Sequence, residues 1–241
     1  MKVRNFLACT GLVAAAVSIS AQELPTREHP TKITYIDLPS TVTASKDGST
    51  STIVNADDAT AAAMADYGFK MIDRVGGMMI SEVNRELATR EIKEAVSIMH
   101  LKSMELPKPV AGKPTVTAIK RTSLMLRDPH NAPDAADTEA LEKIHKQLMA
   151  EQSPDKMILQ KLEKPGQPTE WRVYRPIAAT QSCLACHGDP KTFKPGVKEA
   201  LDILYPEDKA VDYSSHEWRG VIRVSMTAPA APAPAPKPAG K

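Results

Sequence analysis

The feature that most constrains this chain is a short stretch in which Cys183 and Cys186 stand two residues apart and His187 follows at once. Cys-x-x-Cys-His is the attachment sequence of a c-type haem. Thiols at this spacing can each form a thioether bond with one vinyl group of the same porphyrin. The next imidazole then lies beneath the iron as its proximal ligand. The motif therefore predicts one covalent haem c, attached through Cys183 and Cys186 and ligated by His187.

Other uses of a cysteine pair fit this chain less well. A structural zinc site needs four ligands, usually with a second Cys or His pair at short spacing, and the sequence has no such pair. A thioredoxin-like pair lies close to a βαβ pattern, whereas this pair comes late, after a segment that contains Pro176. A disulfide across two residues would constrain almost nothing. A redox disulfide and an incidental match are the alternatives to haem attachment.

Residues 1–21 have the pattern of a secretory signal peptide. Lys2 and Arg4 give a charged start, and an apolar run from Phe6 to Ile19 is followed by small residues near Ala21. That run is too short to make a convincing membrane span, and no later segment is long and apolar enough for one. In bacteria, haem is attached to such motifs outside the cytoplasmic membrane. We therefore expect a periplasmic protein whose mature chain has no membrane span.

The charge balance gives no reason to expect a nucleic-acid partner. The formal net charge is +2, and the signal peptide carries two cations and no acid, which leaves the mature chain neutral. Nucleic-acid binding needs a basic patch or stripe. A neutral chain does not indicate an anionic membrane surface as a partner either.

The mature chain divides by composition into a leader, a folded domain and a tail. Residues 22–58 are polar and rich in Ser, Thr, Asp and Pro, which predicts a mobile leader. Residues 59–226 carry the periodic apolar patterns of a folded domain. Residues 227–241 are almost entirely Ala, Pro and Lys. Because this composition cannot build a core, we expect a disordered tail.

A long helix is predicted at the start of the folded domain. Asp57 or Asp58 can cap it, and apolar residues recur at helical spacing between residues 72 and 99. The glycine pair at residues 76–77 can bend such a helix. Prolines after it end the pattern. We expect one helix, or two in line, ending near residues 102–105.

Strands and shorter helices account for the rest of the domain. Strands are expected over residues 115–119, 121–126, 157–162, 171–177 and 220–226. Helices are expected after Asp134, which can cap the first of them, and over residues 197–204. The strands over 157–162 and 171–177 should form a hairpin, with the Cys-x-x-Cys-His stretch in the following loop. This order predicts an α+β fold with an antiparallel sheet.

Three stretches of the domain are informative in combination. They are Arg121 to Asp134, then Tyr174-Arg175-Pro176-Ile177 leading into Cys183-Leu184-Ala185-Cys186-His187-Gly188-Asp189-Pro190, then Tyr205-Pro206 to Arg219-Gly220-Val221-Ile222. Their order and spacing, over roughly residues 66–226, resemble a family of bacterial PAS-like c-type haem domains, long catalogued as a domain of unknown function. The resemblance implies a PAS-like antiparallel sheet, a long N-terminal helix and one c-type haem bound against the sheet.

The distal ligand of the iron is left open by the sequence. In some relatives a cysteine of the long helix supplies it, and this chain has no cysteine there. The matching stretch, residues 95–102, offers Met99, which continues the apolar stripe, and His100, which lies one residue round the helix. His/Met ligation would raise the haem potential, and two imidazoles would give a lower one. An open position is the third alternative.

Four arginines are candidates to pair with haem propionates, because a guanidinium can bind a carboxylate through two hydrogen bonds. Arg175 and Arg219 are preferred, since they flank the haem segment and the last strand, and Arg121 and Arg127 are the others. His130 lies in the first family-like stretch and could approach the haem edge. The remaining histidines are expected at the surface: His29, His145 and His216.

The resemblance leaves two main functions open, because a fold does not decide between them. The first is redox or small-ligand sensing, in which a gaseous ligand or a change of oxidation state acts on a signalling protein in the periplasm. The second is soluble one-electron transfer to a redox partner. An enzyme such as a peroxidase would need an open iron and a distal acid–base group, for which His100 is the obvious candidate. We do not expect an enzyme.

Overall fold

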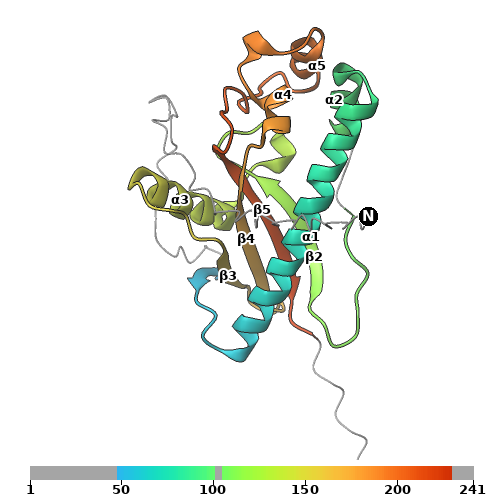
Figure 1. Ribbon diagram of the computed structural model, residues 1–241. Helices are drawn as coiled ribbons and strands as arrows, with labels where there is room; N and C mark the ends of the chain where they lie inside the picture. The colour runs from blue at the N-terminus through green and yellow to red at the C-terminus, as the bar shows by residue number, and fades with distance from the viewer. Residues whose placement is uncertain (1–47, 101–104, 230–241) are drawn as a thin grey trace, which may run out of the picture.

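The computed structural model describes residues 48–100 and 105–229, and their elements are shown in Figure 1. One sheet contains β1 (Thr50–Val54), β2 (Thr115–Thr122), β3 (Ile158–Glu163), β4 (Glu170–Ala178) and β5 (Trp218–Thr227). The strand order is β1-β3-β4-β5-β2, and every neighbouring pair is antiparallel. This sheet confirms the α+β fold class, and the pairing of β3 with β4 confirms the expected hairpin.

Helices lie across the sheet and at one of its ends (Figure 1). The long helix α1 (Ala59–Thr89) runs diagonally over the sheet, and after a break it is followed by α2 (Ile92–His100). The third long element is α3 (Ala135–Met149). The shorter helical segments are η1 (Pro129–Asn131), η2 (Gln181–Cys183), α4 (Leu184–His187), η3 (Pro190–Thr192) and α5 (Val197–Leu204).

The first half of α1 packs closely on the sheet. Asp58 caps the helix, and its side chain accepts a hydrogen bond from the backbone N–H of Ala61 at 2.8 Å. Gly68 marks the closest approach. A Cβ atom there would lie 2.5 Å from Cγ2 of Val173 and 2.6 Å from Cε of Met226. Only a residue without a side chain lets the helix lie this close to β4 and β5.

The two glycines at residues 76–77 do not interrupt α1, which is continuous over Ala59–Thr89. The expected break in the long helix comes instead at Arg90, whose backbone is extended with φ −133° and ψ 160°. Helices α1 and α2 therefore follow one another as two segments, and the sequence had left this alternative open.

We predict that Gly68→Ala destabilises the fold and that Gly77→Ala does not. The first substitution forces α1 away from Val173, at a cost of about 1–3 kcal/mol for overpacking. The second places a methyl group where nothing but the adjacent backbone of α1 itself lies within 4 Å, and it should stabilise the helix by about 0.5–1 kcal/mol. Urea unfolding of both variants followed by circular dichroism measures these changes. Equal stabilities would show that α1 does not lie against the sheet at Gly68.

The opposite face of the sheet is covered by α3. Side chains alternate along β4, so that Val173 belongs to the core under α1 and Tyr174 to the core under α3. Leu141 and Ile144 of α3 are fully buried in this second core, together with Val221 of β5. The molecule therefore has three layers, with the sheet between α1 and α3.

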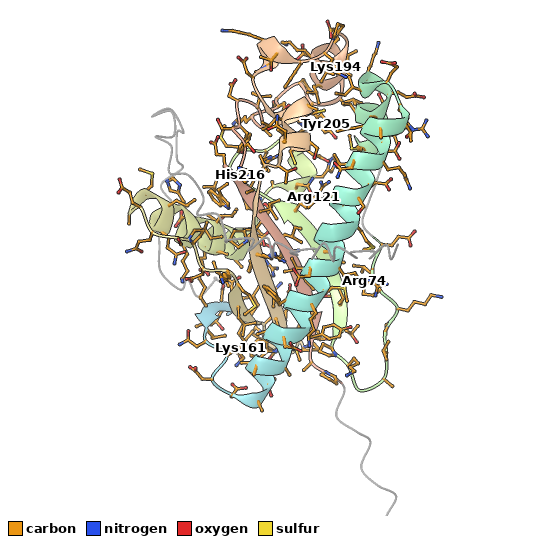
Figure 2. The ribbon with its side chains drawn as sticks, in the orientation of Figure 1. Arg74, Arg121, Lys161, Lys194, Tyr205 and His216 are labelled. Atoms are coloured by element: carbon orange, nitrogen blue, oxygen red, sulfur yellow. The ribbon has the colours of Figure 1, made fainter. Side chains whose placement is uncertain are left out.

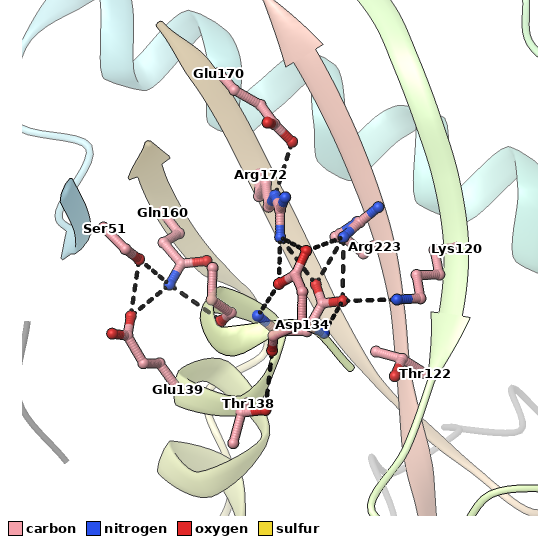
Figure 3. Close-up of polar contacts among 12 residues, drawn as sticks. Ser51, Lys120, Thr122, Asp134, Thr138, Glu139, Gln160, Glu170, Arg172 and Arg223 are labelled. Carbon is pink, nitrogen blue, oxygen red and sulfur yellow. Dashed lines mark hydrogen bonds and ion pairs between the residues drawn. The ribbon is translucent and has the colours of Figure 1, made fainter. Parts of the chain in front are cut away.

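A buried ionic network ties the start of α3 to the sheet (Figure 3). Asp137 is fully buried, and its carboxylate accepts from Nη1 of Arg223 at 2.8 Å and from Nζ of Lys120 at 3.0 Å. Asp134 caps α3 as expected, and it also accepts from Nη1 of Arg172 at 2.7 Å. Because each buried charge has partners, the network fixes α3 at one place on the sheet.

We predict that Asp137→Ala destabilises the protein by about 3–5 kcal/mol, because Arg223 would remain buried with its main partner gone. Asp155→Ala is the matched control. It breaks a half-exposed ion pair with Lys143 of α3, which should cost no more than about 1 kcal/mol. Thermal unfolding of the two variants provides the comparison. Similar losses would mean that the network does not anchor α3.

Several sequence-based expectations need correction. Strand β1 lies within residues 22–58, which were assigned to a polar leader, and it pairs along β3. Its Thr, Ile and Val residues are β-branched and favour a strand, so the folded part begins before residue 59. The two strands expected over 115–126 are one strand, β2. The signal peptide and most of the tail lie outside the described residues.

None of the helices within residues 48–100 and 105–229 is sufficiently long and apolar to cross a membrane.

Candidate functional site

A cavity of about 820 Å³ lies between α1, the sheet and the segment that carries the Cys-x-x-Cys-His motif. A volume of this order is typical of ligand sites, which range from about 300 to 1,000 Å³. The second half of α1 forms one wall, and strands β2, β4 and β5 form another. The apolar lining residues on the two helices are Ile72, Met79, Ile80, Val83, Leu87, Val96 and Met99.

The motif itself is helical and not a loop as expected. Residues 181–183 form η2, and residues 184–187 form α4, which ends where the N–H of Gly188 donates to the carbonyl of Leu184 at 3.0 Å. One helical turn places residues three apart on the same face. Cys183, Cys186 and His187 all line the cavity as a result. The structure thus brings together the three residues on which the sequence prediction rests.

The two cysteines both line the cavity, but their surroundings differ. Neither sulfur is in a disulfide. Cys186 is only 8% exposed and belongs to a small core with Val96 and Val197. Burial raises the pKa of its thiol. Cys183 is half-buried, and its sulfur lies 3.1 Å from the hydroxyl oxygen of Thr180.

His187 is held as a neutral ring with one free nitrogen. Its Nδ1 lies 2.7 Å from the carbonyl oxygen of Ala210. A carbonyl can only accept, so Nδ1 carries the hydrogen. Burial, and after it the charge of Arg127, hold the pKa of His187 well below its usual range. The lone pair of Nε2 is therefore available to a metal, and the hydrogen bond at Nδ1 fixes the tautomer and the ring orientation.

The segment that supplies Ala210 wraps around the motif. The backbone N–H of Tyr213 donates to the carbonyl of His187 at 2.9 Å, and that of Asp212 donates to the carbonyl of Gly188 at 2.9 Å. The ring of Tyr213 also meets the His187 ring edge to face, with centroids 6.2 Å apart. These contacts hold the two segments together along several residues and keep the Ala210 carbonyl at Nδ1.

Arg127, on a third segment of the chain, contacts both the motif and the segment that contains Ala210. Its Nε donates to Asp208 at 2.9 Å, and its Nη2 donates to the carbonyls of Cys186 and Ala210, the latter at 3.1 Å. The sequence analysis gave Arg127 only as one of four candidates for propionates. Its central position was missed because its contacts lie 59 to 83 residues away along the chain. The Arg127 to Pro129 stretch in the family-like motif was the signal that marked it.

The remaining candidate arginines also line the cavity, but they differ in what they bind. Arg175 forms an ion pair with Asp73 of α1 and stacks on Phe69. Arg219 donates to the carbonyl of Met125 at 3.0 Å and stacks on Tyr213. Among the described residues, Arg219 has no carboxylate within ion-pair distance. Of the two preferred residues, Arg219 is thus better placed to receive an anionic group than Arg175.

Arg121 is the second cavity arginine without an ion pair in the described part of the chain. Its Nη1 donates to the sulfur of Met79 on α1 at 3.3 Å. Figure 2 shows Arg121 and Tyr205 on the same side of the molecule, toward the end that carries α4 and α5. Together with Arg219, Arg121 gives the cavity a positive side.

Two methionines of the helices reach the cavity. Met99 of α2 lines it, as expected for a distal ligand, and Met79 of α1 lines it as well. Met79 falls within the apolar pattern of residues 72–99, and its sequence position does not mark it as a ligand. His100 is the last residue of α2, and its side chain lies outside the described part of the structure.

The other described histidines do not line the cavity. The His130 side chain is 95% exposed and bonds to Asp128. His145 stacks on Trp218 in the core under α3, on the far face of the sheet, and is half-buried instead of superficial. His216 is exposed. His29 lies outside the described residues.

These residues fit a c-type haem. The cavity has a suitable size, a largely apolar wall and two arginines without ion pairs for carboxylate groups. Cys183 and Cys186 line it as unbonded thiols. His187 has a free Nε2, because its Nδ1–H is engaged by Ala210. Each chemical part of the cofactor, namely vinyl groups, iron, ring and propionates, thus has matching groups in the cavity.

Fold and site together define an α+β protein whose antiparallel sheet, long helix and Cys-x-x-Cys-His segment enclose one large cavity. The model of the Tll0287-like family matches residues 41–227, and the chain belongs to this family. The match confirms the family resemblance noted in the sequence.

A solved structure, described as that of the cyanobacterial heme-protein Tll0287, is similar to this chain at 24% sequence identity. The alignment covers 47% of this chain and 61% of that one, with a TM-score of 0.34. It therefore spans less than two thirds of that protein. No curated protein matches the chain.

We predict that Cys183 is alkylated before Cys186 in the haem-free chain. The thiolate is the reactive form, and burial both shields Cys186 and raises the pKa of its thiol. Iodoacetamide labelling followed by peptide mass spectrometry measures the two rates. In a Cys186→Ala control, Cys183 should keep its rate. Faster labelling of Cys186 would contradict the packing of α2 and α5 over it.

Proposed function

We propose that this chain is an exported haem-binding protein that carries one covalent haem c. Cys183 and Cys186 attach the porphyrin, and His187 is the proximal ligand of its iron. In attachment, each thiol adds across one vinyl group, and its hydrogen passes to the vinyl carbon, so no atom leaves. When bound, the haem supplies an iron that changes between the ferric and ferrous states and can take an axial ligand.

The observation that carries this proposal is the state of His187 in the cavity. Its Nδ1–H is fixed on the carbonyl of Ala210, which leaves Nε2 free in a cavity that is also lined by two thiols outside any disulfide. A general apolar pocket needs none of these features. The positively charged side of the cavity, with Arg121 and Arg219, supports the placement of the propionates there. Arg175 is less suited, because Asp73 already neutralises it.

We assign the protein to redox or small-ligand sensing in the periplasm. Met99 of α2 brings a thioether to the cavity lining, and a neutral thioether is a ligand that a gas such as CO, NO or O2 can displace. A helix that gains or loses a bond to iron could pass the change to a signalling protein. Soluble one-electron transfer to a redox partner is the alternative, supported by the same residue, because Met ligation raises the haem potential. We propose no enzymatic activity.

Covalent attachment is tested on the chain purified from the periplasm of a bacterium that matures c-type haems. We expect haem to stay with the polypeptide in denaturing electrophoresis. Cys183→Ala together with Cys186→Ala should abolish this signal, and Met149→Ala, a substitution at an exposed residue of α3, should preserve it. A wild-type chain without bound haem would refute the proposed function.

Ligand binding separates sensing from electron transfer. For a sensor, we expect the ferrous protein to take up CO. The distal ligand is tested separately. We expect Met99→Ala to abolish the weak charge-transfer band that methionine gives to ferric haem. His100→Ala and Met79→Ala should keep that band if Met99 is the ligand. A low-spin, six-coordinate spectrum in both oxidation states with no CO uptake would favour the electron carrier. Loss of the band in Met79→Ala alone would move the distal ligand to α1.

A further inference from the structure

The carbonyl oxygen of Ala210 accepts hydrogen bonds from two side chains at once. Nδ1 of His187 lies 2.7 Å from it, and Nη2 of Arg127 lies 3.1 Å from it. A carbonyl oxygen has two lone pairs, so both contacts can be made together. The imidazole of the proposed iron ligand therefore shares its hydrogen-bond acceptor with a permanently charged guanidinium.

Arg127 is fixed in this position by further contacts. Its Nη2 also donates to the carbonyl of Cys186, and its Nε donates to Asp208 Oδ2 at 2.9 Å. The other oxygen of Asp208 accepts from the backbone N–H of Ala210 at 2.8 Å. The side chains of Arg127 and Asp208 are only 13% and 10% exposed. Their charges are consequently little screened by solvent.

We propose that the Arg127–Asp208 pair sets the electron-donating strength of His187, and thereby the reduction potential of the iron, with the two residues acting in opposite directions. Arg127 favours the ferrous state and Asp208 the ferric state. The inference rests on the proposed function, since it needs an iron at Nε2. Both are positioning residues, because they act through His187 and the field around it.

The direction of each effect follows from the hydrogen bonds. An acceptor at Nδ1–H pushes electron density toward Nε2, which stabilises the more positive ferric iron. Arg127 draws on the same oxygen of Ala210 and so weakens that push. Its positive charge also favours the less charged ferrous iron. Asp208 has the contrary effect, because it neutralises Arg127 and adds a negative charge at the same place.

A merely structural pair would behave differently. If Arg127 and Asp208 only held segments together, removing either would loosen the site in the same way, and the potential would move in one direction or not at all. Opposed shifts identify an electrostatic role. The signs of the two shifts in reduction potential therefore distinguish an electrostatic role of the pair from a structural one.

The test uses the full chain with covalent haem and measures the midpoint potential by spectroelectrochemistry. We expect Arg127→Gln to lower and Asp208→Asn to raise it. Each should change the equilibrium constant of one-electron reduction by about tenfold, or about 59 mV. The double variant should return close to the wild-type value. Lys143→Gln, which removes one positive charge on α3 across the sheet, is the control and should leave the potential unchanged.

The iron–histidine stretching frequency in resonance Raman spectra of the ferrous protein gives a second readout when it is measured in the Met99→Ala background, where the iron lacks the proposed distal ligand. It should rise in Arg127→Gln, where His187 donates more strongly, and fall in Asp208→Asn. If the Arg127→Gln variant does not fold, the midpoint potentials of the Asp208→Asn and Arg127→Lys variants test the proposal in its place. A potential that does not rise in Asp208→Asn overturns the inference.

Shifts of the same sign in Arg127→Gln and Asp208→Asn also overturn it, as does a Lys143→Gln shift of equal size. These failures are distinguishable from a failure of the proposed function. If the proposed function fails, the wild-type chain itself carries no covalent haem. If only the inference about Arg127 and Asp208 fails, haem content is complete and only the potentials disagree.

Discussion

The hydrogen bond from Nδ1 of His187 to the carbonyl of Ala210 is the interaction on which the site depends. It selects the tautomer, fixes the ring and leaves Nε2 free, and none of this can be specified by the motif alone. The acceptor is supplied by a segment 23 residues further along the chain, which backbone hydrogen bonds from Asp212 and Tyr213 hold against the motif. A short helical turn thus acquires a defined chemistry only through this second segment.

The sheet separates two kinds of interior. Under α3, buried charges meet in pairs, and Asp137 with Arg223 holds the helix in register. On the α1 side, the interior is apolar near Gly68 and opens further along into the cavity. The alternation of side chains along β4 and β5 makes this division possible, because neighbouring residues face opposite layers. The cavity side has ion pairs of its own, Arg175 with Asp73 and Arg127 with Asp208, but it also leaves Arg121 and Arg219 without a carboxylate partner among the described residues.

Much of the fold could be predicted from local patterns. The cap at Asp134 and the helix over residues 197–204 are both in the structure as expected, because they depend on a few neighbouring residues. Strand β1 was missed, since three of its five residues are Thr or Ser, which also make up a polar leader. The position of Arg127 was also missed. Long-range contacts of one side chain leave no periodic trace in a sequence, whereas the Cys-x-x-Cys-His spacing does.

The close approach at Gly68 has a consequence for how α1 can vary in sequence. The apolar contacts that hold α1 to the sheet lie mainly in its first half, between Ala61 and Val75, whereas the cavity is bordered mainly by its second half. The contacts that stabilise the helix and those that would receive a cofactor therefore overlap little. The packing of the helix and the lining of the cavity are thus set by largely different residues of α1, so a substitution can alter one with little effect on the other.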